Sequence, residues 1–96
     1  MIDFLLECNI KKDTVNALNS RLPSSTIFSL SCNEYEINKI IMYLKKIGIK
    51  CIDDILINYT DLFFNTYDES VSIFKKYDIK KLVEFINKDY NVLSQL

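Results

Sequence analysis

The sequence predicts an all-α protein, and three observations lead to this prediction. Apolar residues recur at the three-to-four-residue spacing of a helix over most of the chain. One glycine and one proline in 96 residues are too few for the frequent turns of a β-sandwich or barrel. A short motif typical of a helix end also recurs three times. We therefore expect one domain, residues 1–96, in which about six helices form three irregular helix-turn-helix repeats, stacked as a short α-solenoid or a helical bundle.

The chain divides into approximate repeats at 1–30, 31–65 and 66–96. Each repeat contains two stretches with apolar residues at helical spacing. We expect helices at 2–6, 14–22, 37–47, 52–59, 70–77 and 82–90. Pro23 makes the longest break, and residues 26–30 leave room for a short extra helix. A single helical hairpin cannot bury its apolar stripe alone, so the three repeats must share one core.

The repeated helix-end motif reads LLECNIKK at 5–12, LKKIGIKC at 44–51 and FKKYDIKK at 74–81. Asn9, Gly48 and Asp78 stand at the same place in the three copies, each directly before an isoleucine. Asparagine, glycine and aspartate tolerate the left-handed conformation that commonly follows a helix end. We predict a helix-end turn at each of these three residues.

A second motif predicts where two helices begin. Ser31-x-x-Glu34 and Thr66-x-x-Glu69 each follow an apolar pair and stand at corresponding places in two repeats. Serine or threonine followed three residues later by glutamate is the capping-box pattern, which satisfies free N–H groups at a helix start. We predict a capping box at both places.

Nothing in the sequence indicates catalysis or metal binding. Histidine is absent, and the chain has no phosphate-binding loop, no nucleophile elbow and no paired metal ligands. Asp53 and Asp54 are adjacent, so on a helix they point about 100° apart and suit its first turn. Cys8, Cys32 and Cys51 are far apart and odd in number, which favours free thiols in a reducing compartment. We expect no enzymatic activity, no cofactor, no metal and no small-molecule substrate.

Lysines gather around the three helix-end turns. The nine are Lys11, Lys12, Lys45, Lys46, Lys50, Lys75, Lys76, Lys80 and Lys81. If the hairpins stack, these lysines form a basic ridge for phosphates or for an acidic partner. The alternative is that lysines at helix C-termini only complement the helix dipole, at about 0.3–1 kcal/mol each. The net charge of −1 argues against a strong sequence-independent grip on nucleic acid.

The aromatic residues divide into two expected groups. The spacing predicts that one group is buried: Phe28, Phe63, Phe74, Tyr77 and Phe85. The other group is expected at the surface: Tyr35, Tyr43, Tyr67 and Tyr90. A surface cluster of tyrosines would suit a protein interface or the stacking of nucleic-acid bases.

The two ends of the chain are apolar, with IDFLL at 2–6 and VLSQL at 92–96. Either they fold back onto the core, or they bury against a second copy and form a homodimer. The first residues lack the basic region and the cleavage site of a signal peptide, and no apolar run approaches the ~18 residues of a membrane span. We therefore expect a cytoplasmic protein that does not enter a membrane.

The stretch LKKIGIKCIDDILINYTDLFF, residues 44–64, resembles the helical repeat of the mitochondrial transcription termination factor (mTERF) family. The matching positions are Leu44, Ile47, Gly48 and Ile49 in the first part, and Tyr59, Leu62 and Phe63 in the corner, where Thr60 replaces the family's proline. The resemblance implies a curved α-solenoid that binds nucleic acid along a basic inner face. LKKIGIKCIDDIL also resembles the helix-hairpin-helix elements of DNA-processing proteins, which present turn N–H groups to a phosphate and usually carry a second glycine at the place of Lys50.

Taken on its residues, the sequence favours a non-enzymatic helical-repeat module that binds another protein or a second copy of itself. The alternative is binding of RNA or DNA through the lysine ridge.

Overall fold

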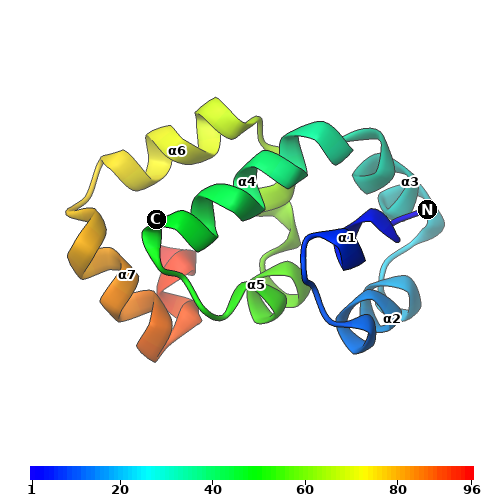
Figure 1. Ribbon diagram of the computed structural model, residues 1–96, viewed down its shortest axis with the longest axis horizontal. Helices are drawn as coiled ribbons and strands as arrows, with labels where there is room; N and C mark the ends of the chain where they lie inside the picture. The colour runs from blue at the N-terminus through cyan, green and yellow to red at the C-terminus, as the bar shows by residue number, and fades with distance from the viewer.

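The computed structural model describes residues 1–96, and its regular elements are all helices, which confirms the all-α class (Figure 1). The elements are α1 (Phe4–Glu7), α2 (Lys12–Arg21), α3 (Ser24–Cys32), α4 (Glu34–Ile47), α5 (Ile52–Asn58), η1 (Thr60–Phe64), α6 (Tyr67–Lys75), α7 (Ile79–Lys88) and η2 (Tyr90–Gln95), where η marks a 3₁₀-helix.

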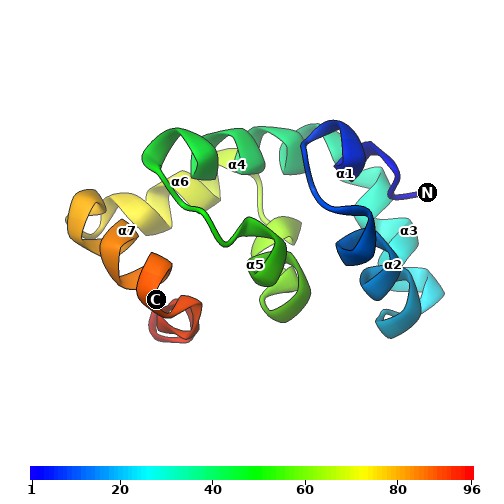
Figure 2. The same ribbon diagram turned by 60° about the horizontal axis from the view of Figure 1, so that its bottom comes forward.

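The helices follow one another as three units of three helices each: α1–α2–α3, α4–α5–η1 and α6–α7–η2. Figure 2 shows α1, α4 and α6 along the upper side, with α2, α5 and α7 below them. The expected number of about six helices was too low, because each unit adds a third helix after its hairpin. Helix α3 continues to Cys32, two residues past the approximate boundary at residue 30.

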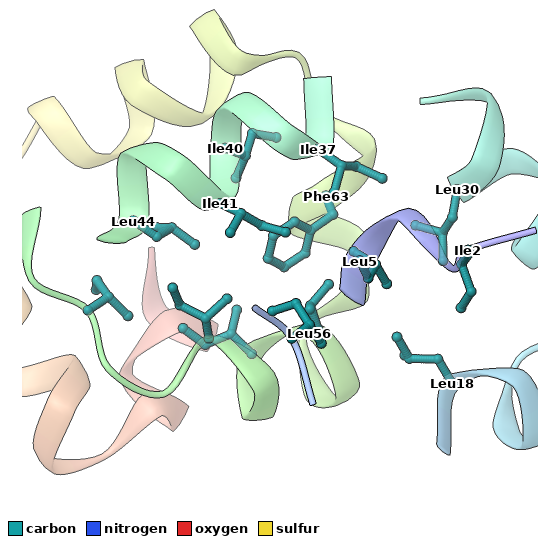
Figure 3. Close-up of a cluster of buried hydrophobic side chains, with 14 of the residues drawn as sticks. Ile2, Leu5, Leu18, Leu30, Ile37, Ile40, Ile41, Leu44, Leu56 and Phe63 are labelled. Atoms are coloured by element: carbon teal, nitrogen blue, oxygen red, sulfur yellow. The ribbon is translucent and has the colours of Figure 1, made fainter. Parts of the chain in front are cut away.

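Helix α4 lies at the centre of the fold, and its buried side carries Ile37, Ile40, Ile41 and Leu44. This i, i+3, i+4, i+7 pattern places all four side chains on one side of the helix. Figure 3 shows them directed toward Phe63 of η1, with Leu5, Ile2 and Leu18 further along the same core. One continuous hydrophobic cluster joins residues of all three units, so the chain has a single core.

The apolar ends fold back onto this core. Ile2 and Leu5 are completely buried, and Val92, Leu93 and Leu96 pack against the cluster as partly buried residues. Burying an isoleucine or leucine side chain stabilises the fold by about 1.5–3 kcal/mol. Both ends therefore fold back onto the core, and Val92, Leu93 and Leu96 keep part of their surface exposed.

Two of the three predicted helix-end turns are confirmed. Asn9 and Gly48 have φ angles of 64° and 100°, the left-handed conformation expected just past a helix. In both turns the N–H of the following isoleucine returns to a leucine carbonyl, Ile10 to Leu5 at 3.2 Å and Ile49 to Leu44 at 2.9 Å. This six-to-one hydrogen bond is the mark of a Schellman motif, and the burial of both isoleucines supplies its hydrophobic contact.

The prediction for Asp78 is wrong. Its φ of −69° and ψ of 105° are extended, and its Oδ1 accepts a hydrogen bond from the Lys81 N–H at 3.4 Å. Aspartate is a favoured N-cap residue, because its carboxylate satisfies a free N–H of the first turn. Asp78 therefore begins α7, whereas Asn9 and Gly48 end helices.

One of the two predicted capping boxes is confirmed. The Glu69 N–H donates to Thr66 Oγ1 at 3.2 Å, and the Thr66 N–H donates to Glu69 Oε1 at 2.8 Å. The backbone N–H of Thr66, and after it the Thr66 side chain, lower the pKa of the Glu69 carboxyl by hydrogen bonding to it. The box at Ser31 and Glu34 is wrong, because Ser31 still lies inside α3 and its hydroxyl donates to the Phe28 carbonyl at 2.7 Å.

Replacing Thr66 and Ser31, the hydroxyl residues of the two predicted capping boxes, should have unequal effects on stability. Thr66→Ala removes the N-cap acceptor of α6 and should lower the free energy of unfolding by about 1 kcal/mol. Ser31→Ala changes a position inside a helix and should stay within about 0.5 kcal/mol of the wild type. Urea denaturation followed by circular dichroism measures both. Equal losses in the two variants would contradict the assignment.

Candidate functional site

Three of the four tyrosines expected at the surface come together. Tyr35 and Tyr43 lie on α4, and Tyr67 is the first residue of α6, the helix packed beside α4. Tyr90 lies elsewhere, with its ring 6.2 Å from that of Tyr59. We define the tyrosine face as Tyr35, Lys39, Met42, Tyr43, Lys46 and Tyr67.

The outer side of α4 carries most of this face. Tyr35, Lys39, Met42 and Lys46 follow the spacing i, i+4, i+7, i+11. At about 100° per residue this stripe is centred roughly 180° from the buried stripe of the same helix. Tyr35 is 72% exposed and Met42 68% exposed, which is unusual for large apolar side chains.

The tyrosine face surrounds a shallow hollow of about 360 Å³ between α4 and α6. Its lining consists of Lys39, Met42, Tyr43, Lys46 and Tyr67, so the charged groups in it are both cations. Large amphipathic side chains around a concave surface are the type of arrangement that receives a partner's apolar side chain.

Lys39 holds the rim of this hollow together. Its Nζ lies 4.6 Å from the ring centroid of Tyr35 and 5.1 Å from that of Tyr67, so one ammonium group faces two rings from different helices. Its hydrogen bond with the Tyr35 hydroxyl, 3.5 Å long, raises the pKa of Lys39, and the carboxylates of Glu36 and Asp68 act in the same direction. Lys39 therefore stays charged and orients both rings.

Tyr43 supports the hollow from the α4 side. Its ring packs edge-on against Tyr67, with centroids 6.1 Å apart, and lies tilted against Phe74 with centroids 6.0 Å apart. Its hydroxyl is buried without a hydrogen-bond partner, and so is the hydroxyl of Ser70 on α6. Burial raises the pKa of Tyr43, which keeps the phenol neutral. Each unpaired buried hydroxyl costs about 1–3 kcal/mol of stability.

A second hollow, of about 570 Å³, lies where the ends of α2, η1 and η2 meet α6. We define the leucine groove by its aliphatic residues and its one charged residue: Leu22, Leu62, Ile73, Leu93, Leu96 and Asp61. Figure 2 shows α2, the C-terminal end of α5 and the end of the chain, which contribute to this groove, along the lower side of the molecule. The aliphatic residues are all partly exposed, so the groove has an apolar floor that solvent reaches.

All nine lysines of the predicted ridge are exposed. Each turn that these lysines flank comes after the C-terminal end of a helix, and the three helices are α1, α4 and α6 (Figure 1). Lys45 Nζ donates to the Cys8 carbonyl, and the Lys11 N–H donates to Asp53 Oδ2 at 2.9 Å, so the first two turns lie close together. Acidic residues stand between the lysines, because Asp53 lies beside the first turn and Asp78 begins α7.

The backbone of the Gly48 turn is fully engaged within the chain. The N–H groups of Gly48 and Ile49 donate to carbonyls of α4. The Lys50 N–H donates to Asn87 Oδ1 at 2.9 Å, and Asn87 Nδ2 donates back to the Gly48 carbonyl at 3.0 Å. Gly48 thus serves as a corner that α7 clamps, and none of these three N–H groups is free to bind a phosphate in the manner of a helix-hairpin-helix element.

The expected burial of aromatic residues is only partly right. Phe63 and Phe74 are buried, but Phe28 is 58% exposed, Phe85 57% and Tyr77 42%. Phe85 stands next to buried Ile86, about 100° further round α7, which turns it outward. Met42 and Lys39 of the tyrosine face were not predicted from the sequence, although their spacing opposite the isoleucine stripe of α4 could have identified them.

The cysteines are free thiols, as predicted. Burial raises the pKa of the Cys8 and Cys51 thiols, whereas Cys32 is exposed. No three cysteine, aspartate or glutamate side chains lie close enough together to hold a metal ion. None of the helices has both the length and the apolar character that crossing a membrane requires.

No protein-family model matches the chain, and neither a curated protein nor a solved structure does.

Removing the unpaired hydroxyl of Tyr43 should stabilise the protein. Tyr43→Phe deletes a buried polar atom without a partner, so we expect the free energy of unfolding to rise by about 1 kcal/mol. Tyr59→Phe is the matched control, because the Tyr59 hydroxyl donates to Asn91 Oδ1 at 2.9 Å and its loss should lower stability by a similar amount. Urea titrations of both variants test the difference in sign. A loss of stability in Tyr43→Phe as large as in the control would contradict it.

Proposed function

We propose that the chain is a non-enzymatic protein-binding module and that the tyrosine face is its main binding surface. The observation that carries this proposal is the pair of strongly exposed side chains, Tyr35 and Met42, beside the hollow between α4 and α6. Tyrosine and methionine are enriched at protein interfaces, and tyrosine is among the residues that contribute most binding energy.

The rigidity of the surface supports the same proposal. Four residues of α4 are buried in the core directly behind the face. Lys39 and its two neighbouring tyrosine rings hold one another in place. A surface ordered before binding loses little conformational entropy when a partner arrives, so more of the contact energy appears as affinity.

The leucine groove is the weaker candidate for the main surface. Its aliphatic residues are half-buried, and three of its five polar lining residues, Asn58, Tyr59 and Thr60, are engaged within the chain. Thr60 Oγ1 donates to the Leu56 carbonyl at 2.6 Å, and the Tyr59 hydroxyl donates to Asn91. The groove therefore offers fewer groups to fix a partner's orientation than the tyrosine face does.

Site-specific photo-crosslinking tests the proposal in the cell that makes the protein. A crosslinking amino acid in place of Met42 should yield a discrete protein adduct, and the same amino acid in place of the exposed Asn19 on α2 should not. Tyr35→Ala should reduce the adduct at position 42 at least several-fold, because tyrosine anchors carry much of the binding energy at interfaces. Adducts of equal yield at both positions, or none at position 42, would argue against the tyrosine face.

Nucleic-acid binding is the second candidate, and the exposed lysines around the turns after α1, α4 and α6, three helices that run in the same direction, favour it (Figure 1). Counterion release would make such binding fall steeply with added salt. Changing Lys45, Lys46, Lys75 and Lys76 to Glu should then abolish it. If the wild-type chain binds neither RNA nor DNA at low salt, this candidate is excluded.

A further inference from the structure

We propose that one partner of the tyrosine face is the leucine groove of a second copy of this chain. The inference rests on the proposed function, since it identifies what the tyrosine face binds. Tyr35 and Met42 of one copy would enter the groove between Leu22, Leu62 and Leu96 of the next.

Charge complementarity favours this pairing over the pairing of two identical faces. The charged residues lining the hollow of the tyrosine face are Lys39 and Lys46, and the one charged residue lining the leucine groove is Asp61. Bringing two tyrosine faces together would oppose the lysines of one hollow to those of the other. Glu36 and Asp68, near Lys39, would reduce this repulsion without removing it, since neither carboxylate lines the hollow. Placing the face on the groove sets the lysines opposite a carboxylate.

The apolar parts are also complementary. The tyrosine face presents protruding side chains on the outer side of a single helix, at α4 positions 35 and 42. The groove presents partly exposed aliphatic side chains around a concavity of about 570 Å³. An amphipathic helix that lays exposed anchors into an apolar groove is a recurrent mode of protein recognition.

The geometry makes the contact head to tail. Tyr67 lines the first hollow and Ile73 lines the second, and six residues apart on α6 their side chains point about 120° away from one another. The two surfaces therefore open on different sides, so the tyrosine face of one molecule cannot enter the leucine groove of the same molecule. Each added copy leaves one face and one groove free, and the series grows unless its rotation closes a ring.

The surface area is sufficient for such a contact. A standard interface buries about 800 Å² per partner. Both contacts of one copy would then cover roughly a quarter of its accessible surface of 5942 Å². Of the nine lysines at the turns, only Lys46 lines either of the two hollows.

Two variants, each defective in one surface, test the inference. Met42→Glu places a charge on the protruding face and leaves the groove intact. Asp61→Lys reverses the groove's charge and leaves the face intact. Both positions are exposed, so circular dichroism and urea denaturation should show that both variants fold normally. Asn19→Glu on α2 is the matched control for adding a surface charge.

Sedimentation velocity over a concentration series gives the readout. The wild type and Asn19→Glu should form species larger than a dimer as concentration rises, and each defective variant alone should remain monomeric. An equimolar mixture of the two variants should form a 1:1 dimer and nothing larger, because only one intact face and one intact groove can meet.

Three results would overturn the inference. The first is a wild type that stays monomeric at millimolar concentration. The second is a dimer that survives Asp61→Lys and is lost in Met42→Glu, which would indicate two identical faces in contact. The third is a mixture that forms no dimer. If crosslinking at position 42 still captures a different protein in any of these cases, the proposed function stands and only the identity of the partner is wrong.

Discussion

Burial of the isoleucine stripe of α4 against Phe63 is the contact on which the rest of the structure depends. Ile37, Ile40, Ile41 and Leu44 fill the centre of the single core, and the first and third units assemble around them. Because these four residues are buried on one side of α4, the opposite side of the helix faces away from the core. Since α6 covers only the flank that carries Tyr43, the stripe from Tyr35 to Lys46 faces outward on a rigid support. The core contact therefore also fixes the geometry of the candidate binding surface.

Polar contacts between units set the spacing of the helices around that core. Asp53 at the start of α5 accepts hydrogen bonds from the Lys11 N–H and the Thr14 hydroxyl of the first unit, and Asn87 of α7 clamps the Gly48 turn of the second. Asn33 and Glu36 join α4 to the entry of α6, through the Phe63 carbonyl and the Tyr67 N–H. Hydrogen bonds of this kind add little net stability, but an unpaired group would cost more than the pair contributes. These hydrogen bonds therefore select one packing of the helices around a core that is otherwise entirely apolar.

Much of the fold could be predicted from the sequence, because helical periodicity and local helix-end chemistry depend on neighbouring residues. The turns at Asn9 and Gly48 and the capping box at Thr66 followed from such local rules. The predictions at Asp78 and Ser31 were wrong because the same residue types suit more than one place in a helix. Which place each residue occupies depends on where α6 and α3 end. The binding surfaces were harder to foresee. Tyr43 and Tyr67 meet only because α6 packs beside α4, and the leucine groove needs ends of elements that are far apart in sequence.

The distribution of charge explains why apolar anchors, more than charges, should determine affinity. Acids occupy the first turns of α4, α5 and α6, and lysines the last turns of α4, α6 and α7, as the helix dipole favours. This segregation places lysines at the C-terminal ends of α4, α6 and α7 while the net charge stays at −1. Exposed charges are screened within about 8–10 Å at physiological salt, so they orient an approaching partner and reject a wrong one without holding it tightly. On this stripe Met42 lies between Lys39 and Lys46, and Tyr35 lies one turn before Lys39. Desolvation of the two apolar anchors can supply the affinity, and the lysines the direction of approach.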